Sequence, residues 1–172
     1  TALDAASGDY VGVLESDDYV CANGWTLLMD EAVSHSLEVV KGCYYRTSSE
    51  RGDSYFEVCR NVDEHCPASL DEVPYREVVS AKEYPRCFWI NPSIWSGVYS
   101  REFLQRENVR FNETPGASYQ DVSFAFKVWT SAERAMLLPE PIIHYRTDNE
   151  FSSSNSKAKV FAVCDEVDEC AE

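Results

Sequence analysis

An apolar run that ends in three closely spaced acidic residues is the feature that most constrains this chain. The run covers residues 10–14 (YVGVL), and Glu15, Asp17 and Asp18 follow it directly. A short apolar run bounded by Gly and polar residues predicts a buried strand. Side chains placed where such a strand ends project into the crevice in which open α/β sheets bind ligands. The pattern therefore predicts an α/β fold with acidic side chains in the ligand-binding crevice where this strand ends.

Three crowded carboxylates also indicate what this site binds. Close carboxylates repel and raise each other's pKa. A divalent metal with oxygen ligands, Mg²⁺ or Mn²⁺, would remove this penalty and could hold the diphosphate of a nucleotide-linked substrate. The alternative is a solvated turn without a ligand, because Ser and Asp favour turns.

Composition limits the fold and the partners. A chain of 172 residues that is 44% hydrophobic is long and apolar enough for one globular domain. Its net charge of −15 disfavours nucleic acid and a polybasic membrane patch as partners. An anionic substrate would need positive charge from a bound metal. We expect no transmembrane segment, since no apolar stretch approaches the ~20 residues that span a bilayer.

Seven cysteines, an odd number without a CxxC pair, disfavour a disulfide framework and a structural zinc site. Reduced thiols in a cytoplasmic protein are the simplest interpretation. Cys43, Cys87 and Cys164 have apolar neighbours and are expected in the core. The chain has no initiator Met and begins inside a predicted helix, so we expect it to be a fragment of a longer protein.

Apolar spacing and turn residues predict the elements. Helices are expected up to Gly8 and over 25–37, after Ser100 as N-cap, over 119–132 and from 157 to the end. Strands are expected over 10–14, 38–46, 134–138 and 141–144, with a polar turn at 47–54. Residues 55–83 give no clear pattern, and 85–92 carry an aromatic run between prolines. The predicted inward-facing positions are Leu28, Ala32, Val33, Phe103, Leu104, Val122, Ala125, Phe126, Trp129, Val160, Val163, Cys164 and Val167.

Four motifs occur in a fixed order along the chain. They are 8–19 (GDYVGVLESDDY), 93–104 (SIWSGVYSREFL), 109–113 (VRFNE) with 119–124 (YQDVSF), and 144–146 (HYR) with 152–154 (SSS). This order resembles the family 2 glycosyltransferases of bacteria over nearly the whole chain. That family uses the GT-A fold, a Rossmann-like α/β domain that binds a nucleotide sugar.

The resemblance implies roles for the acidic residues. Asp17 matches the position that binds the metal, and Asp18 would ligate it directly or support it from behind. Glu15 stands where the family has an Asp that meets the ribose of the donor, so it is a candidate donor contact together with Asp17. His144 is a candidate further metal ligand, and the alternative is an ordinary half-buried histidine.

Asp121 matches the position of the family's catalytic base, at the start of a predicted helix. A partly desolvated carboxylate has a raised pKa and is a better base, and such a base contributes ~10²–10⁴-fold in rate. The alternative is that Asp121 only favours the positive end of the helix dipole. A single displacement assisted by one base inverts the anomeric centre, so inversion is expected.

The resemblance also suggests donor and acceptor contacts. Trp95 could stack on the donor sugar, and Gly97 would let the backbone approach a ligand; core packing is the alternative for Trp95. Tyr119, Gln120 and Arg146 are candidate acceptor contacts, with packing or ion pairing as the alternative. The acidic residues 165–172 are expected on the solvated face of the last helix.

By the same resemblance, the family's N-terminal half, which carries the nucleotide-binding strands, is absent. The chain is thus expected to be one partial GT-A domain that is inactive alone. Within it, 1–46 would hold the metal-binding strand and the helix and strand after it, 47–92 a variable acceptor side, 93–156 the donor loop, base helix and C-terminal strands, and 157–172 the last helix. A cut sheet edge would leave unpaired backbone through which the fragment could self-associate.

The expected function is inverting, metal-dependent transfer of a sugar from a nucleotide diphosphate sugar to a glycan or lipid-linked acceptor. The resemblance places it in cell-surface polysaccharide synthesis, in the cytoplasm or at the inner face of the membrane. Two alternatives stay open: a non-catalytic carbohydrate- or partner-binding module that kept the fold, and a metal-dependent phosphohydrolase that uses the acidic cluster alone.

Overall fold

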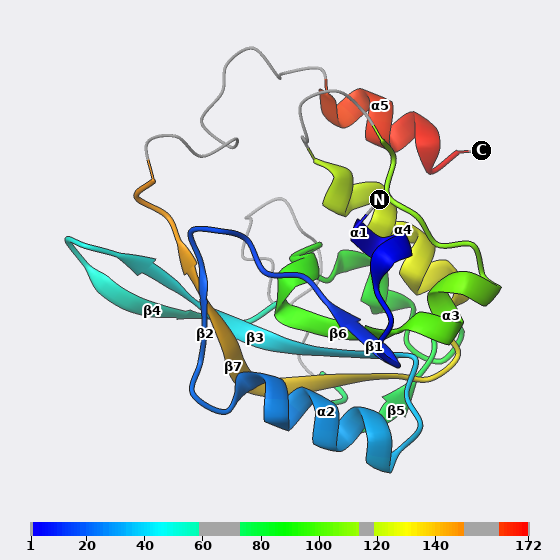
Figure 1. Cartoon of the computed structure of the whole chain (residues 1–172), viewed down its shortest axis with the longest axis horizontal. Coiled ribbons are helices and arrows are strands. Elements are labelled where there is room, and N and C mark those ends of the chain that lie inside the picture. The colour runs from blue at the N-terminus through cyan, green and yellow to red at the C-terminus, as the bar shows by residue number, and fades with distance from the viewer. Residues whose placement is uncertain (1, 59–72, 114–118, 150–161, 172) are drawn as a thin grey trace.

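The chain folds into one mixed sheet with helices on both faces (Figure 1). The computed structural model describes residues 2–58, 73–113, 119–149 and 162–171. The α-helices are α1 (Ala2–Ala5), α2 (Gly24–Ser34), α3 (Arg101–Arg106), α4 (Gln120–Ser131) and α5 (Ala162–Glu169), and the 3₁₀ helices are η1 (Pro85–Trp89) and η2 (Ile94–Ser96). The strands are β1 (Tyr10–Gly12), β2 (Tyr19–Val20), β3 (Val39–Ser48), β4 (Gly52–Phe56), β5 (Val78–Val79), β6 (Gly97–Ser100) and β7 (Ala135–Arg146).

Strands β3 and β7 form the centre of the sheet and run parallel to each other. The strand order is β1-β6-β3-β7-β2, with β4 paired to β3 and β5 paired to β7. The other strand pairs are antiparallel. Strand β1 lies at one edge and β2 at the other, so the loop that joins them, which carries the acidic residues, passes from one edge of the sheet to the other.

Two apolar cores, one on each face, hold the sheet and helices together. Successive side chains of a strand point to opposite faces. In β3, Val40 accordingly packs in the core between the sheet and α2, while Val39 and Cys43 pack in the core between the sheet and α4. Figure 1 shows α2 alone below the sheet and α3, α4 and α5 above it. The α4 side is thus the face on which a candidate base at the start of α4 must act.

The start of α3 confirms the predicted N-cap. The Ser100 hydroxyl accepts a hydrogen bond from the backbone N–H of Phe103 at 3.3 Å, which satisfies a donor that has no partner inside the helix. Phe103 and Leu104 are buried, as their spacing predicts. Asn108 has a positive φ of 51°, and the helix ends just before it.

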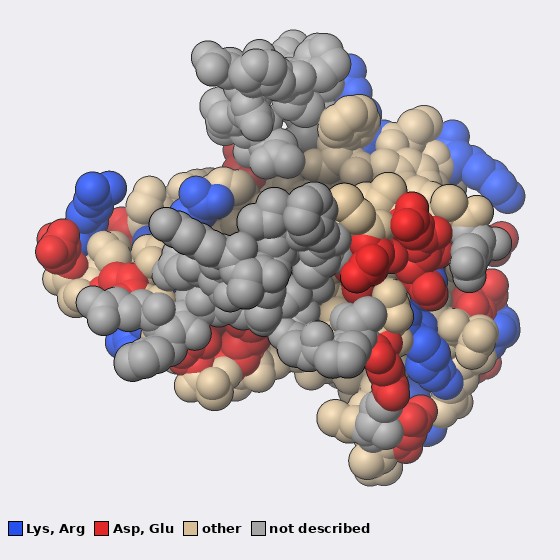
Figure 2. Space-filling view, turned by 90° about the horizontal axis from the view of Figure 1, so that it is seen from above, with Lys and Arg blue, Asp and Glu red and all other residues tan. Residues whose placement is uncertain are grey.

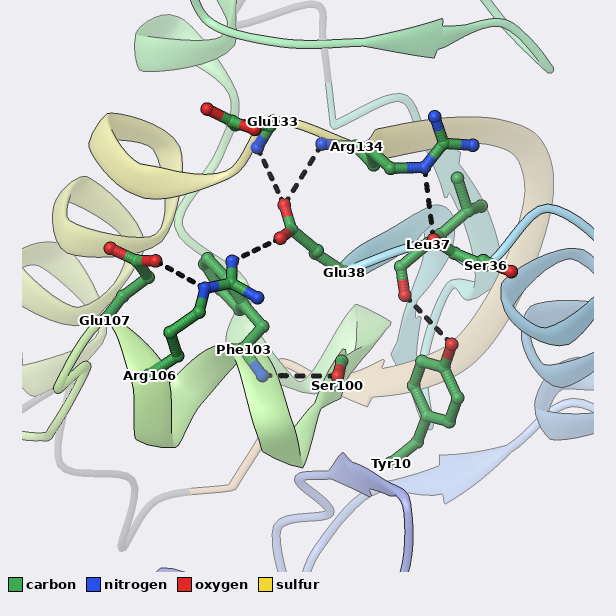
Figure 3. Close-up of polar contacts among 10 residues, drawn as sticks. All are labelled: Tyr10, Ser36, Leu37, Glu38, Ser100, Phe103, Arg106, Glu107, Glu133 and Arg134. Carbon is green, nitrogen blue, oxygen red and sulfur yellow. Dashed lines mark hydrogen bonds and ion pairs between the residues drawn. The ribbon is translucent and has the colours of Figure 1, made fainter.

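Glu38 joins three segments on the α3 side of the sheet (Figure 3). One carboxylate oxygen accepts from the backbone N–H groups of Glu133 and Arg134, at 2.7 and 3.1 Å. The other oxygen accepts from the guanidinium of Arg106. Since charged acceptors make the stronger hydrogen bonds, Glu38 fixes the loop between α4 and β7 against β3 and α3.

The strand assignments differ from the sequence-based prediction in several places, and β5 and β6 lie where no strand was predicted. Residues 52–56 form β4 in a hairpin with β3, although 47–54 were expected to be a turn. Strand β2 had no sequence signal, since it has two residues. The two predicted strands 134–138 and 141–144 are one strand, β7, because its pairing with β3 continues through register shifts around Cys43.

Several predicted helix faces are wrong. In α2, Leu28 and Ala32 are buried, but Val33 is 63% exposed. In α4, Trp129 is buried, while Val122 and Ala125 are only half-buried and Phe126 is exposed. The buried residues of α4 are Ser123, Phe124, Val128 and Trp129.

The last helix differs most from its predicted pattern. Val167 is 55% exposed and Cys164 is exposed, although both were expected to face inward. Glu166, expected on the solvated face, is instead fully buried. The buried face of α5 thus carries an acid, while an apolar residue of the predicted inward face lies exposed. Val160 lies outside the described residues.

The described cysteines are free thiols, with Cys43 and Cys87 buried as expected. Cys59 and Cys66 lie outside the described residues.

Among the residues that the structure describes, none of the helices is long and apolar enough to cross a membrane. In the view from above, Asp and Glu side chains lie beside Lys and Arg side chains on the visible face (Figure 2).

Candidate functional site

The acidic loop follows β1 and brings three carboxylates together. One carboxylate oxygen from each of Glu15, Asp17 and Asp18 lies within 4.8 Å of the others. The loop turns back on itself, since the backbone N–H of Asp18 donates to the Glu15 carbonyl at 3.3 Å. The structure thus collects on one short turn the residues that the sequence singled out.

The end of β7 and the residues after it hold this loop in place. Asp18 Oδ1 accepts from the backbone N–H of Arg146 at 2.8 Å. Asp17 Oδ2 accepts from the side-chain amide of Asn149 at 2.6 Å. Two carboxylates are therefore oriented by a segment far away in the sequence.

The electrostatics of the loop favour a bound cation. Burial raises the pKa of Glu15, and the charges of Asp18 and Asp17 raise it further. Burial also raises the pKa of Asp18, although the hydrogen bond from Arg146 opposes this. Asp18 Oδ2 is buried with no hydrogen-bond partner in the part of the chain that is described.

A buried carboxylate oxygen without a partner is costly unless a ligand satisfies it. Glu15, Asp17 and Asp18 offer only oxygen atoms, and Mg²⁺ and Mn²⁺ favour oxygen ligands. The residues present therefore fit a hard divalent cation of this kind.

Asp121 is the second residue of α4 and is half-buried. Burial raises its pKa, while the backbone N–H groups at the start of the helix and the ammonium of Lys41 lower it. The charge of Asp121 in turn raises the pKa of Glu15. The candidate base and the acidic loop, which lie far apart in the sequence, are therefore within electrostatic range of each other.

Lys41 is a buried cation beside this site that the sequence-based analysis did not select. It is only 3% exposed in the middle of β3, and its Nζ donates to the carbonyl of Ser93 and, at 3.0 Å, to the Ser93 hydroxyl. A lysine inside an apolar strand is rarely buried unless it has partners. The sequence signal that could have identified Lys41 is its position inside the apolar run 39–43 (VVKGC).

Trp95 and Gly97 are both explained by packing. Trp95 is 7% exposed; it stacks on Tyr145 with ring centroids 4.9 Å apart and meets the edge of Tyr44. A Cβ atom at Gly97 would lie 2.6 Å from the carbonyl oxygen of Val40. The close approach at Gly97 is thus made by a neighbouring strand, and contact of either residue with a donor sugar stays a prediction.

His144 lies on β7 but is not one of the three residues that form the acidic cluster. Its ring stacks on Tyr19 with centroids 4.3 Å apart. Its Nδ1 lies 3.2 Å from Asp53 Oδ2 and 3.2 Å from Thr47 Oγ1. These contacts among the described residues fit the alternative of an ordinary half-buried histidine, and a metal-ligand role for His144 stays a prediction.

The three candidate acceptor residues lie at different places. Tyr119 precedes α4 with a left-handed backbone, φ 61°, and is exposed. Gln120 lines an open cavity of about 470 Å³ together with Phe111 and Arg110. The Arg146 side chain points to solvent near Asp148, at 3.7 Å, while its backbone N–H holds Asp18.

This fold and sequence are similar to those of known glycosyltransferases. The chain is 29% identical over 152 residues to the uncharacterized glycosyltransferase EpsJ of Bacillus subtilis (strain 168), covering 85% of this chain and 40% of EpsJ. No family model matches the sequence. A crystal structure of S. aureus TarS 1–349 in complex with UDP-GlcNAc superposes with a TM-score of 0.63 at 19% identity, covering 90% of this chain and 39% of that chain.

A structure of TarS 1–349 without a named ligand superposes with a TM-score of 0.59 at 17% identity, covering 84% of this chain and 38% of that chain. The chain is thus similar in sequence to a glycosyltransferase and has the fold of TarS 1–349 over most of its length. The predicted α/β fold and the resemblance to GT-A glycosyltransferases are thereby confirmed. The chain spans about two fifths of the length of EpsJ and of TarS 1–349.

Proposed function

We propose that the full-length gene product transfers a sugar from a nucleotide diphosphate sugar to a hydroxyl of a glycan or lipid-linked acceptor, with inversion. The observation that carries this proposal is the electrostatic proximity of Asp121 to the acidic loop at Glu15. A base beside a diphosphate-binding site is what a single displacement at the anomeric carbon requires. The complex of TarS with UDP-GlcNAc supports a UDP-linked sugar as donor.

Glu15, Asp17 and Asp18 would hold Mg²⁺ or Mn²⁺. A bound divalent ion stabilises the negative charge that builds on the leaving diphosphate. Asp18 Oδ2 supports this assignment, because the carboxylate is oriented through Arg146 and this oxygen has no hydrogen-bond partner among the described residues. Asp17, held by Asn149, supplies a second fixed carboxylate.

Asp121 would accept the proton of the acceptor hydroxyl as that oxygen attacks the anomeric carbon. Its carboxylate must be ionised to do so, and its basicity rises with its pKa. Burial raises this pKa, and the Lys41 ammonium limits the rise. The raised pKa of Asp121 thus suits a base that is stronger than an exposed aspartate.

The order of motifs along the chain supports a role in cell-surface polysaccharide synthesis. We propose that the donor is used on the cytoplasmic side, in solution or at the inner face of the membrane. The acceptor would approach from the α4 side of the sheet, since Asp121 and Gln120 lie at the start of that helix.

The substitution Asp121→Asn in the full-length gene product tests this function. We expect kcat for sugar transfer to fall by ~10²–10⁴-fold while the affinity for the donor is retained, because the amide keeps the shape but cannot take a proton. Asp168→Asn, an exposed site on α5, is the matched control and should keep the wild-type rate. Wild-type transfer by Asp121→Asn would contradict the assignment. Release of free phosphate without any acceptor would favour the phosphohydrolase alternative.

A further inference from the structure

Glu166 is a fully buried acid on α5 that the proposed chemistry does not use. Its side chain is 0% exposed. The Ser123 hydroxyl donates to Glu166 Oε2, while Oε1 is buried without a hydrogen-bond partner in the described part of the chain. Burying a carboxylate in this way costs free energy, and an apolar residue would fill the position at lower cost. The position therefore calls for a reason other than packing.

Glu166 contacts the same helix turn that presents the candidate base. Ser123 lies two residues after Asp121 in the first turn of α4. A second tie between the helices lies one turn further along, where the Lys127 ammonium pairs with the carboxylate of Glu169. Helix α5 thus holds α4 at two points, and the buried one is next to Asp121.

The charge of Glu166 also reaches the base. It raises the pKa of Asp121, in addition to the larger effect of burial. The Lys41 ammonium on β3 lowers the pKa of Asp121. The charge of Asp121 in turn raises the pKa of Tyr99 on β6 and of Glu15 in the acidic loop.

The titratable groups around Glu166 itself lie on α4 and α5. The Cys170 thiol donates to the Glu166 backbone carbonyl, and Lys127 and Glu169 act on that thiol as well. Lys127 is paired with Glu169 at the edge of the helix pair. The arrangement places two carboxyl groups at the first turn of α4, the half-buried Asp121 and the buried Glu166.

We propose that Glu166 is a positioning residue for Asp121, which fixes the first turn of α4 through Ser123 and places a second buried carboxyl group beside the base. This inference rests on the proposed function, in which Asp121 is the base. It assigns to α5, which lies outside the four sequence motifs, a role in the reaction. A structural role alone would hold the helix but would leave the titration of Asp121 unchanged.

The substitution Glu166→Gln separates the two roles, because the amide can still accept the Ser123 hydrogen bond but carries no charge. In the full-length gene product, we expect the acidic limb of the kcat/KM profile to move to lower pH, since removal of a nearby negative charge lowers the pKa of Asp121. Asp168→Asn removes the same charge from an exposed position on the same helix and should leave the limb in place. An acidic limb that is the same in Glu166→Gln as in the wild type would overturn the proposal.

A second measurement reads the site without sugar transfer. The carboxyl carbon of Asp121, labelled with ¹³C and identified by its loss in Asp121→Asn, should titrate at lower pH in Glu166→Gln than in the wild type. Glu166→Ala should also speed amide hydrogen exchange over 121–124 and lower kcat by up to ~10²-fold, as expected when a catalytic group is misplaced. An unchanged titration of Asp121 would overturn the inference, whereas absent transfer with a shifted titration would overturn only the proposed function.

Discussion

Asp18 accepts a hydrogen bond from the backbone N–H of Arg146 at 2.8 Å, across 128 positions of sequence. This contact fixes one oxygen of Asp18 against the end of β7 and leaves the other, Oδ2, buried without a partner among the described residues. A carboxylate held in this way is pre-oriented for a cation, because the backbone fixes its direction before any ligand arrives.

The substitution Asp18→Asn is therefore expected to weaken Mn²⁺ binding by at least ~10-fold, since it removes one charged ligand but keeps an acceptor for Arg146. Isothermal titration of the full-length gene product with MnCl₂ measures this directly. Glu50→Gln, at the exposed turn between β3 and β4, changes the net charge equally and should bind Mn²⁺ as the wild type does. Equal affinity in Asp18→Asn and the wild type would remove Asp18 from the metal site.

The rate of sugar transfer should depend on pH through Asp121. Burial raises the pKa of this acid above its ordinary value of 3.8, so its protonated, inactive form persists to higher pH than that of an exposed aspartate. Activity should be present above the raised pKa and be lost as the pH falls through it. A profile of kcat/KM against pH checks this, and an acidic limb at or below pH 3.8 would contradict it.

Gly97→Ala should lower the free energy of unfolding by about 1–3 kcal/mol, a typical cost of overpacking a tight site. The added Cβ would lie 2.6 Å from the Val40 carbonyl oxygen, which is backbone and cannot turn away. Urea denaturation measures the loss, with Gly8→Ala, whose Cβ would meet the nearest atom at 3.3 Å, as the milder control. If Gly97→Ala is as stable as the wild type but binds the donor poorly, Gly97 acts on the ligand and not on the sheet.

Glu38→Ala should destabilise the domain by about 1–3 kcal/mol, because it leaves the N–H groups of Glu133 and Arg134 without their acceptor (Figure 3). Glu107→Ala removes only a surface ion pair with Arg106, which should contribute about 0–1 kcal/mol. Thermal unfolding of the two variants compares these costs. Equal midpoints would show that Glu38 does not join these segments in a way that matters for stability.

The sequence predicted the elements whose signals are local. Ser100 caps its helix through its own side chain, and this cap is present as predicted. The helix predicted over 119–132 from apolar spacing is also present, as α4. The acidic turn after β1 was also predictable, because it stands where an apolar run ends. The edge strand β2 was not, because a two-residue strand exists only through its pairing with β7.

Burial in the peripheral helices was not predictable from apolar spacing. Val33 and Val167 lie exposed, and Glu166 lies buried, because the faces of α2 and α5 depend on which neighbouring elements cover them. The buried Lys41 follows the same rule, since Ser93 supplies its acceptors from across the fold. The partners of Asp18 and His144 likewise come from long-range pairing with β7, about which a single sequence carries no local signal.

The most direct test of the central claim is a thermal-shift measurement on the full-length gene product with UDP, with and without Mn²⁺, beside the variant Asp17→Ala. A ligand at 100 times its Kd stabilises the native state by about 2.7 kcal/mol. We predict that UDP raises the unfolding midpoint only when Mn²⁺ is present, and that Asp17→Ala abolishes this shift. Absence of a shift with UDP, GDP, CDP or dTDP in the presence of Mn²⁺ would contradict a metal-dependent glycosyltransferase and favour a binding module that kept the fold.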